Sequence, residues 1–251
     1  MGHARLSMWG ALRQELAELL LPQRCVVCSN FGAAIHASCI EVLPRADGER
    51  CLRCWAPLLL GRARGAAPDR PELCDRCGLE PAPGAPVIEA RRAAFRFEGA
   101  ARLAILEAKF RGVSALLPPL ARAAAGAVDP AWSIEGVAWV PLHPSRLRRR
   151  GFDQGRAIAE HVARALEVPV RGDLIRRVRA TAAQASLGRA ERARNVAGAF
   201  APRRALRGPA PARVLVVDDV ATTGATLAAA TVALRGADVE RVFALTLAIE
   251  D

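Results

Sequence analysis

Two adjacent acids, Asp218 and Asp219, end an apolar run and directly precede a loop rich in threonine. Residues 214–217 are four apolar residues, three of them β-branched, which is typical of a strand buried on both faces. The alanine-rich residues 227–234 after the loop predict a helix. Ligands of open α/β sheets bind at loops that follow the carboxyl ends of strands, so this strand, loop and helix predict a binding site.

The loop between the acids and the helix has the chemistry of an anion site. Backbone N–H groups at the start of a helix, with the hydroxyls of Thr222, Thr223 and Thr226, form a cup for a phosphate group. Gly224 lets the backbone approach that phosphate without an intervening Cβ. The two carboxylates before the cup suit the cis-diol of a ribose or a bound cation, so the stretch predicts a phosphorylated sugar. Taken alone, the acid pair would indicate only an acidic strand end followed by a threonine N-cap.

The stretch resembles the phosphoribosyl-pyrophosphate (PRPP) motif of type I phosphoribosyltransferases, in which a hydrophobic strand and two acids precede a phosphate loop. It has neither the Gly-Lys-Ser/Thr of a Walker loop nor the spacing of a dinucleotide fingerprint. The resemblance implies that Asp218 and Asp219 face the ribose hydroxyls at the catalytic centre, and that residues 221–226 hold the 5′-phosphate. The PRPP contacts that it implies beyond the acids are Val220, Ala221, Thr222, Thr223, Gly224, Ala225 and Thr226.

A second constellation lies in the first eighty residues, which contain all seven cysteines. Six cysteines form C-x-x-C pairs, and the seventh, Cys39, has His36 at the matching position. These four knuckles supply enough ligands for two tetrahedral zinc sites. The candidate ligands are Cys25, Cys28, His36, Cys39, Cys51, Cys54, Cys74 and Cys77.

Structural zinc is favoured over two other interpretations of these cysteines. Disulfides do not suit a reducing compartment, and a redox C-x-x-C is normally a single pair on an α/β unit. Sequential pairing of the knuckles is the simplest; a crossed pairing, a single occupied site, and His36 as a plain surface histidine stay open. The sequence between the knuckles has few core residues, so metal binding would supply its stability.

A proline-rich stretch at 81–86 predicts a boundary between two domains. We expect an N-terminal helix and double zinc module over residues 1–82 and a second domain over residues 83–251. The other elements expected from apolar patterns and turn residues are an edge strand at 90–97, helices at 99–110, 114–127 and 158–166, and strands at 137–140 and 239–249. The helix at 99–110 would present Leu103, Leu106 and Phe110 along one apolar face, and Gly236 would follow the helix after the phosphate loop.

Basic residues follow the strand predicted at 137–140, as acids follow the strand at 214–217. A loop with His143 leads into five arginines, and such a loop can hold a diphosphate, although a basic run is also typical of a solvated face. The arginines are Arg146, Arg148, Arg149, Arg150 and Arg156. Lys109 is either a cation at a helix C-terminus or a phosphate contact. Residues 176–196 are expected to be largely exposed and to close over a ligand, or to contact nucleic acid.

The composition indicates a globular protein with polyanionic partners. The 251 residues suffice for one full core and a small appendage. A net charge of +11 indicates partners such as nucleotides, pyrophosphate or nucleic acid, although coding bias toward arginine and alanine would give the same excess. No apolar run reaches the ~18 residues of a membrane span, and residues 6–20 predict an amphipathic helix rather than a signal peptide. We expect no membrane insertion and a cytoplasmic location.

The motifs together resemble the ComF (competence protein F, GntX-like) family along nearly the whole chain. The matching stretches are the cysteine pairs, LEAKFRG, VPLHPSRLRRRGFDQ, RRVRATAAQASLGRAERARNVAGAF and VLVVDDVATTGATL. The resemblance implies an α/β fold, in which a type I phosphoribosyltransferase-like domain with a mostly parallel sheet flanked by helices joins a small N-terminal zinc-ribbon module. The family commonly has cysteine in place of His36 and asparagine in place of Asp153. Zinc accepts either ligand, whereas a carboxylate beside a diphosphate loop needs an arginine or a cation.

The resemblance also implies a reaction. PRPP would bind with Mg²⁺, its phosphoribosyl group would pass to an unidentified acceptor, and pyrophosphate would leave. Lys109, Arg146 and Arg150 are candidates for stabilising the pyrophosphate, and His143 for a further PRPP contact. The family's link to DNA uptake implies single-stranded DNA or a helicase-like partner. The alternative is a non-catalytic protein that senses PRPP or a nucleotide, or an adaptor that binds DNA or a partner of the competence machinery.

Overall fold

The structure discussed below is a computed structural model, and the residues that it describes are 23–58, 72–78, 88–181, 188–203 and 208–251. The helix predicted at 6–20 and the boundary predicted at 82/83 lie outside these residues. That boundary therefore stays a prediction.

The centre of the protein is a four-stranded parallel sheet. Its strands, listed from one edge to the other, are β1 (Arg91–Arg96), β6 (Arg241–Ile249), β5 (Arg213–Ala221) and β2 (Gly136–Trp139). Residues 214–217 of β5 are completely buried, as expected for a strand that is covered on both faces. The predicted parallel α/β sheet is confirmed, with β1 at its edge.

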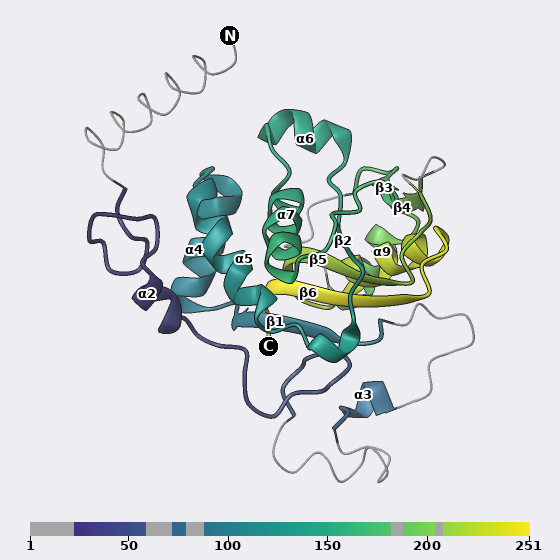
Figure 1. Ribbon diagram of the computed structural model, residues 1–251, viewed down its shortest axis with the longest axis horizontal. Coiled ribbons are helices and arrows are strands. Elements are labelled where there is room, and N and C mark those ends of the chain that lie inside the picture. Colours follow the sequence, from purple (N-terminus) through teal and green to yellow (C-terminus); the bar gives the residue numbers. More distant parts are fainter. Residues whose placement is uncertain (1–22, 59–71, 79–87, 182–187, 204–207) are drawn as a thin grey trace.

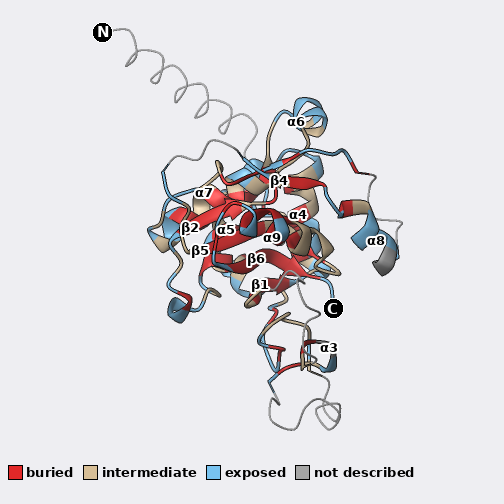
Figure 2. Ribbon diagram, turned by 90° about the vertical axis from the view of Figure 1, so that its right-hand side faces the viewer, coloured by how far each residue is buried: buried red, intermediate tan, exposed pale blue. Residues whose placement is uncertain are grey.

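Helices cover both faces of the sheet (Figure 1). On one face α4 (Gly99–Phe110), α5 (Leu117–Ala125) and α7 (Gln154–Leu166) share a core with the odd-numbered residues of β5. On the other face α9 (Ala225–Arg235) packs with a two-stranded antiparallel sheet, formed by β3 (Ile175–Arg177) and β4 (Phe200–Pro202). Figure 2 shows the buried strands lying between these layers.

Short helices connect or flank the main elements. They are α2 (Ala37–Glu41), α3 (Asp75–Gly78), α6 (Pro144–Arg150) and α8 (Arg189–Val196), with 3₁₀ turns at Ser114–Leu116 and Pro130–Trp132. The helix expected over 114–127 is therefore divided, because prolines occupy the first turn of α5, where they fit. None of the helices in the described ranges has the length and hydropathy that a membrane span requires.

The apolar face predicted for α4 is wrong. Leu103 and Phe110 are 45% and 66% exposed. The buried residues of α4 are instead Ala101, Ala104, Ile105 and Ala108. Both sets have helical spacing, and the small alanine side chains allow the helix backbone to approach the sheet closely. The bulky side chains of Leu103 and Phe110 suggested the buried face in the sequence, but in the structure the buried face is the one that carries the alanines and Ile105.

Several element ends also differ from the prediction. β5 continues through the two acids to Ala221, and α7 begins at Gln154 rather than 158. Gly236 caps α9 with a φ of −69°, so it does not supply a left-handed turn. The left-handed residue in this turn is Asp238, with a φ of +64°, a conformation that aspartate tolerates better than most residues.

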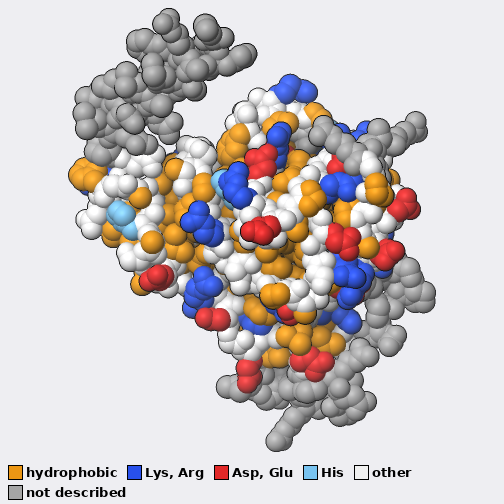
Figure 3. Space-filling view, viewed as in Figure 1, with side chains coloured by type: hydrophobic (Ala, Val, Ile, Leu, Met, Phe, Trp, Pro, Cys, Tyr) orange, Lys and Arg blue, Asp and Glu red, His pale blue; other side chains and the backbone are white. Residues whose placement is uncertain are grey.

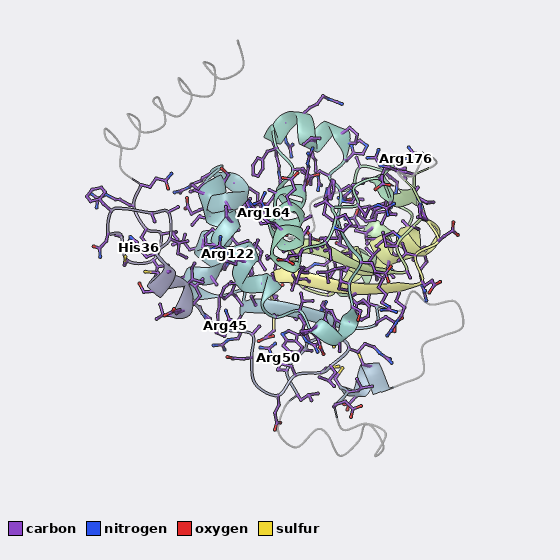
Figure 4. All side chains as sticks on the ribbon, in the orientation of Figure 1. His36, Arg45, Arg50, Arg122, Arg164 and Arg176 are labelled. Atoms are coloured by element: carbon purple, nitrogen blue, oxygen red, sulfur yellow. The ribbon has the colours of Figure 1, made fainter. Side chains whose placement is uncertain are left out.

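The N-terminal cysteine-containing segment is joined to the sheet. The backbone N–H of Ala46 donates to Ala94, and Arg45 pairs with Phe95, so this segment extends the edge beside β1 in antiparallel fashion. Arg50 is 7% exposed and forms two hydrogen bonds to the Asp251 carboxylate, of 2.6 and 2.9 Å. Figure 4 shows Arg50 beside β1, on the side of the sheet where α3 lies. The segment thus contributes to the same packed unit as the sheet.

The corrected face of α4 can be tested by truncating one residue on each side of the helix. Ile105→Ala should lower the free energy of unfolding by about 2–4 kcal/mol, since Ile105 is completely buried and its truncation leaves a cavity. Leu103→Ala should change it by less than about 1 kcal/mol, because the side chain is 45% exposed and alanine favours the helix. Urea unfolding followed by circular dichroism measures both. A larger loss of stability for Leu103→Ala than for Ile105→Ala would show that the face predicted from the sequence is the buried one.

Candidate functional site

The two acids of β5 point to opposite faces of the sheet at its carboxyl end. Asp219 lies on the side of α4, where its Oδ2 is 2.5 Å from Lys109 Nζ. Asp218 lies on the side of β3, within electrostatic range of Arg177. Because consecutive strand residues alternate in direction, one pair of neighbours in the sequence reaches both layers of the fold.

Asp218 is the strongly perturbed group of the pair. Burial and the Asp219 carboxylate raise the pKa of Asp218 to about 7, against the opposing attraction of Lys109 and Arg177. A carboxyl group that titrates near neutral pH beside a second carboxylate is typical of a binding or catalytic site.

The loop after β5 has the geometry of an anion cup. Gly224 is the N-cap of α9 with a left-handed φ of +78°, which glycine adopts without strain. The Thr223 hydroxyl accepts a 3.3 Å hydrogen bond from the backbone N–H of Ala225. Thr222 and Thr226 are half-buried on either side. The structure therefore brings the predicted loop residues together at the start of an 11-residue helix, where the dipole favours an anion.

Two arginines converge on the side of the site that contains Asp218. Arg146 of α6 donates to the Thr181 carbonyl, and Arg177 of β3 donates to the Thr181 hydroxyl, each at 2.5 Å. Burial, then the charge of Arg146, lower the pKa of Arg177; burial, then Arg150 and Arg149, lower that of Arg146. Both guanidinium groups nevertheless stay charged. They form a positive cluster next to the carboxylates.

Arg177 was not among the predicted site residues, since residues 176–196 were expected to be largely exposed. That expectation is wrong for Arg177, Thr181 and Val196, which are buried. The sequence around Arg177 carries no signal of this burial, because Ile175 and Val178 place an apolar residue on each side of the strand; only the structure shows that Arg177 shares the buried face with Ile175. Figure 4 shows Arg176 at the outer side of β3.

The remaining basic candidates lie around the end of α4. The guanidinium carbon of Arg150 is 5.6 Å from the centre of the Phe110 ring, and Lys109 Nζ is 5.9 Å from it. The exposed ring of Phe110 thus separates two of the predicted pyrophosphate contacts. Arg148 and Arg149 are exposed on α6.

Two residues of the basic loop have capping roles in the structure. His143 caps α6, because its Nδ1 lies 3.3 Å from the Ser145 backbone N–H and 2.7 Å from the Ser145 hydroxyl. Asp153 caps α7 by accepting from the backbone N–H of Arg156, and it also accepts a 3.0 Å hydrogen bond from the indole of Trp139. Asp153 therefore ties β2 to α7, and these donors compensate the carboxylate that replaces the family's asparagine.

Two buried polar side chains near the site have no hydrogen-bond partner within the described residues. They are the amide of Gln154 and the hydroxyl of Thr246. Thr246 is the β6 residue in register with Asp218, and Gln154 is the first residue of α7, directly after the basic loop. Buried polar groups of this kind are normally satisfied, so these two side chains, unpaired among the described residues, are exceptions.

The predicted metal ligands form two separate groups. The first contains Cys25, Cys28, His36 and Cys39, the second contains Cys51, Cys54, Cys74 and Cys77, and within each group the ligand atoms lie within 4.8 Å of one another. The sequential pairing is the one that the structure has. His36 Nδ1 is 3.4 Å from Cys28 Sγ, while its Nε2 is 3.2 Å from the Phe31 carbonyl. That carbonyl fixes the ring with Nδ1 toward the sulfurs, as is usual for a metal-binding histidine.

Comparison with known proteins identifies the chain's relatives. Residues 153–250 match the model of the phosphoribosyl transferase domain. Over 219 residues the chain is 31% identical to the DNA utilization protein YhgH of Salmonella typhimurium, a match that covers 84% of this chain and 89% of that protein. YhgH of Escherichia coli K12 matches with the same identity and coverage. The chain belongs to the ComF family.

Other proteins match shorter parts of this ComF protein. Competence protein F of Haemophilus influenzae is 33% identical over 108 residues, which is 43% of this chain and 47% of the relative. The solved orotate phosphoribosyltransferase of Aeropyrum pernix covers 56% of this chain and 73% of its own, with 17% identity and a TM-score of 0.32. That likeness is too low to assign any property.

The pKa of Asp218 predicts how the stability of this ComF protein depends on pH. The folded pKa, about 7, lies above the unfolded value of 3.8, so between these values the folded state binds more protons than the unfolded state, and stability falls as pH rises. Asp218→Asn should remove this loss and stabilise the protein at pH 8 by at least about 1.4 kcal/mol, which corresponds to one pKa unit. Urea unfolding at pH 5 and pH 8 measures the difference.

The neighbouring acid supplies the control for this pH experiment. Asp219→Asn should move the fall in stability to lower pH, because it removes the neighbouring carboxylate that helps to raise the pKa of Asp218. An Asp218→Asn protein with the wild-type dependence on pH would show that Asp218 does not titrate near neutrality.

The two ligand groups predict a zinc content of two per chain. Cys51→Ser should lower the content to about one, since three ligands rarely hold structural zinc. His36→Cys should keep it at two, because thiolate and imidazole both bind zinc in such sites. Elemental analysis of the purified protein measures all three values, and a wild-type content below one would contradict the assignment.

Proposed function

We propose that this ComF protein binds PRPP together with Mg²⁺ and transfers its phosphoribosyl group to an acceptor, with release of pyrophosphate. The observation that carries the proposal is the arrangement at the carboxyl end of β5. Two carboxylates, one with a pKa near 7, directly precede a loop whose glycine caps a helix. The matched phosphoribosyl transferase domain spans this stretch.

The parts of PRPP correspond to separate parts of the site. The ribose hydroxyls and Mg²⁺ would be held by Asp218 and Asp219, and the 5′-phosphate by residues 221–226. When bound, Mg²⁺ would neutralise charge on the diphosphate and the ribose oxygens. Lys109, Arg146 and Arg150 would stabilise the departing pyrophosphate. Arg177 joins these candidates because it is buried and contacts the same Thr181 as Arg146.

The chain's contribution to the reaction is positional and electrostatic. Breaking the bond between C1 of the ribose and the pyrophosphate oxygen leaves positive character on the sugar and negative charge on the leaving group. Fixed carboxylates near the ribose and fixed guanidinium groups near the diphosphate stabilise both charges as they develop. The nucleophile then forms the new bond at C1, and pyrophosphate leaves with the electron pair of the broken bond.

A non-catalytic function is the second candidate, and the exposed arginines favour it. Arg148 and Arg149 of α6, and Arg176 and Arg179 at β3, are exposed near the same site, which suits single-stranded DNA or an acidic, helicase-like partner. Figure 3 shows basic and acidic side chains interspersed over one face, without a large area of one sign there. We therefore rank this candidate second.

We further propose that the protein works in a reducing compartment such as the cytoplasm. The support is the grouping of the cysteines, all of which are free and lie with His36 in two metal-ligand groups. Thiols that bind structural zinc must remain reduced.

The proposed binding of PRPP can be tested by replacing both acids with neutral amides of the same shape. Asp218→Asn combined with Asp219→Asn should weaken PRPP binding in millimolar Mg²⁺ by about 100-fold or more, since two charged contacts of roughly 1.5–3 kcal/mol each are lost. Isothermal titration calorimetry measures the affinity. Asp238→Asn with Glu240→Gln is the matched control, because it removes two exposed acids outside the site and should bind as the wild type does.

Turnover separates the two candidate functions. Pyrophosphate release from PRPP should depend on one class among purine, pyrimidine and nicotinate-type bases, amines and single-stranded DNA. Tight PRPP binding without release for any of them would favour sensing over catalysis. Equal binding by the wild type and the double variant would overturn the site assignment itself.

A further inference from the structure

Arg91, the first residue of edge strand β1, is a buried cation between the second metal group and the sheet. It is only 5% exposed. Its Nε donates a 2.8 Å hydrogen bond to the carbonyl oxygen of Cys54, and its Nη2 donates to the same oxygen. Cys54 is one of the four ligands of the second metal group. The backbone of a metal-ligand knuckle thus orients this guanidinium group.

The other side of the same guanidinium group lies against the phosphate loop. A Cβ built on Gly224 would be 2.8 Å from Arg91 Nη1, closer than the Cβ atoms of proteins normally come to a neighbouring atom. The φ of +78° favours glycine at this position, and a larger residue would in addition displace the guanidinium group of Arg91. The contact fixes the loop and the arginine relative to each other.

We propose that Arg91 is a positioning residue of the phosphate loop and connects this loop to the second metal group. It supports the conformation of residues 222–224 and adds a fixed positive charge beside the helix terminus where the 5′-phosphate would bind. The inference rests on the proposed function, and it adds that metal at the second group and 5′-phosphate at the loop favour each other. Such coupling between two sites is reciprocal.

The next residue of β1, Arg92, also contacts the metal-ligand segment but, among the described residues, makes no hydrogen bond to the phosphate loop. Arg92 donates a 3.0 Å hydrogen bond to the Leu52 carbonyl. Its guanidinium carbon lies 4.2 Å from the ring centre of Trp55 and 5.0 Å from that of Trp132. Arg92 therefore holds the same segment as Arg91 and makes its contacts with carbonyls and rings rather than with Gly224. This makes Arg92 a matched control.

The proposal predicts that Arg91 affects one half of PRPP and not the other. Arg91→Ala should weaken ribose 5-phosphate binding by about 10-fold or more, and Arg91→Lys by a smaller factor, because lysine keeps the charge but loses the fork of donors. Neither variant should change pyrophosphate affinity, measured with Mg²⁺, by more than about 2-fold. Arg92→Ala should leave both affinities unchanged. A general loss of structure would lower both affinities together.

A double-mutant cycle tests the connection to the metal group. Cys74→Ser removes a ligand of the second group, and its effect on ribose 5-phosphate affinity should be largely absent in the Arg91→Ala background, because the connection is already broken. His36→Ala, in the first group, should have the same effect in both backgrounds. Calorimetric titration with ribose 5-phosphate measures all of these affinities, and circular dichroism verifies the fold of each variant.

The outcomes distinguish this inference from the function on which it rests. Wild-type protein that binds neither ribose 5-phosphate nor pyrophosphate overturns the proposed function, and this inference with it. Wild-type binding with an unchanged Arg91→Ala variant overturns the role of Arg91 alone. Equal losses for both ligands reduce Arg91 to a structural residue, and additive effects of Cys74→Ser and Arg91→Ala overturn the connection.

Discussion

Two carboxylates at the end of a strand that is covered on both faces determine the rest of the site. Removing a charge from water is costly unless an opposite charge or hydrogen-bond donors replace the lost hydration. Since Asp218 and Asp219 point to opposite faces, each needs its own partners. Asp219 has Lys109 from α4 at 2.5 Å. Asp218 has Arg177 from β3, and burial together with the Asp219 charge nevertheless raises the pKa of Asp218 to about 7.

Local rules explain why these partners stand where they do. Lys109 lies in the last turn of α4, where a cation also interacts favourably with the helix dipole. Arg177 lies on the same face of β3 as the buried Ile175, so its side chain points inward. Its guanidinium carbon lies 5.2 Å from the centre of the Phe200 ring. The aromatic face stabilises the cation that faces the acids. The end of α4 thus supplies a cation for Asp219 on one face of the sheet, and β3 supplies one for Asp218 on the other.

The sequence predicted the features that depend on short-range patterns. The buried strand of β5, the phosphate loop and the four knuckles each follow from residues fewer than about a dozen apart, because strand burial, helix initiation and metal chelation are local. The sequence left a crossed pairing of these knuckles open, and the structure shows the sequential pairing. Even the capping role of Asp153 was within reach of sequence rules, since an acid directly before a helix is a preferred N-cap.

The features that the sequence did not provide depend on contacts between distant segments. Nothing near Ile105 tells whether the bulky or the alanine-rich face of α4 meets the sheet, because that choice depends on how closely β1 and β6 can be approached. Arg91 and Arg177 were read as ordinary strand and loop residues. Their importance arises only when the Cys54 carbonyl, Gly224 and Thr181 are brought beside them by the tertiary fold.

The charge balance of the site also explains why PRPP and Mg²⁺ would bind together rather than singly. A diphosphate alone would meet the arginines but would bring its charge close to Asp219. A cation alone would have to displace Lys109 from Asp219 and a proton from Asp218, and it would be repelled by Arg177. In the proposed complex the cation would neutralise the carboxylates while Lys109 and the arginines would face the phosphates, so that every charge would have a partner of opposite sign. The positive charge of Arg91 beside the loop would add to this balance at the 5′-phosphate of the proposed ligand.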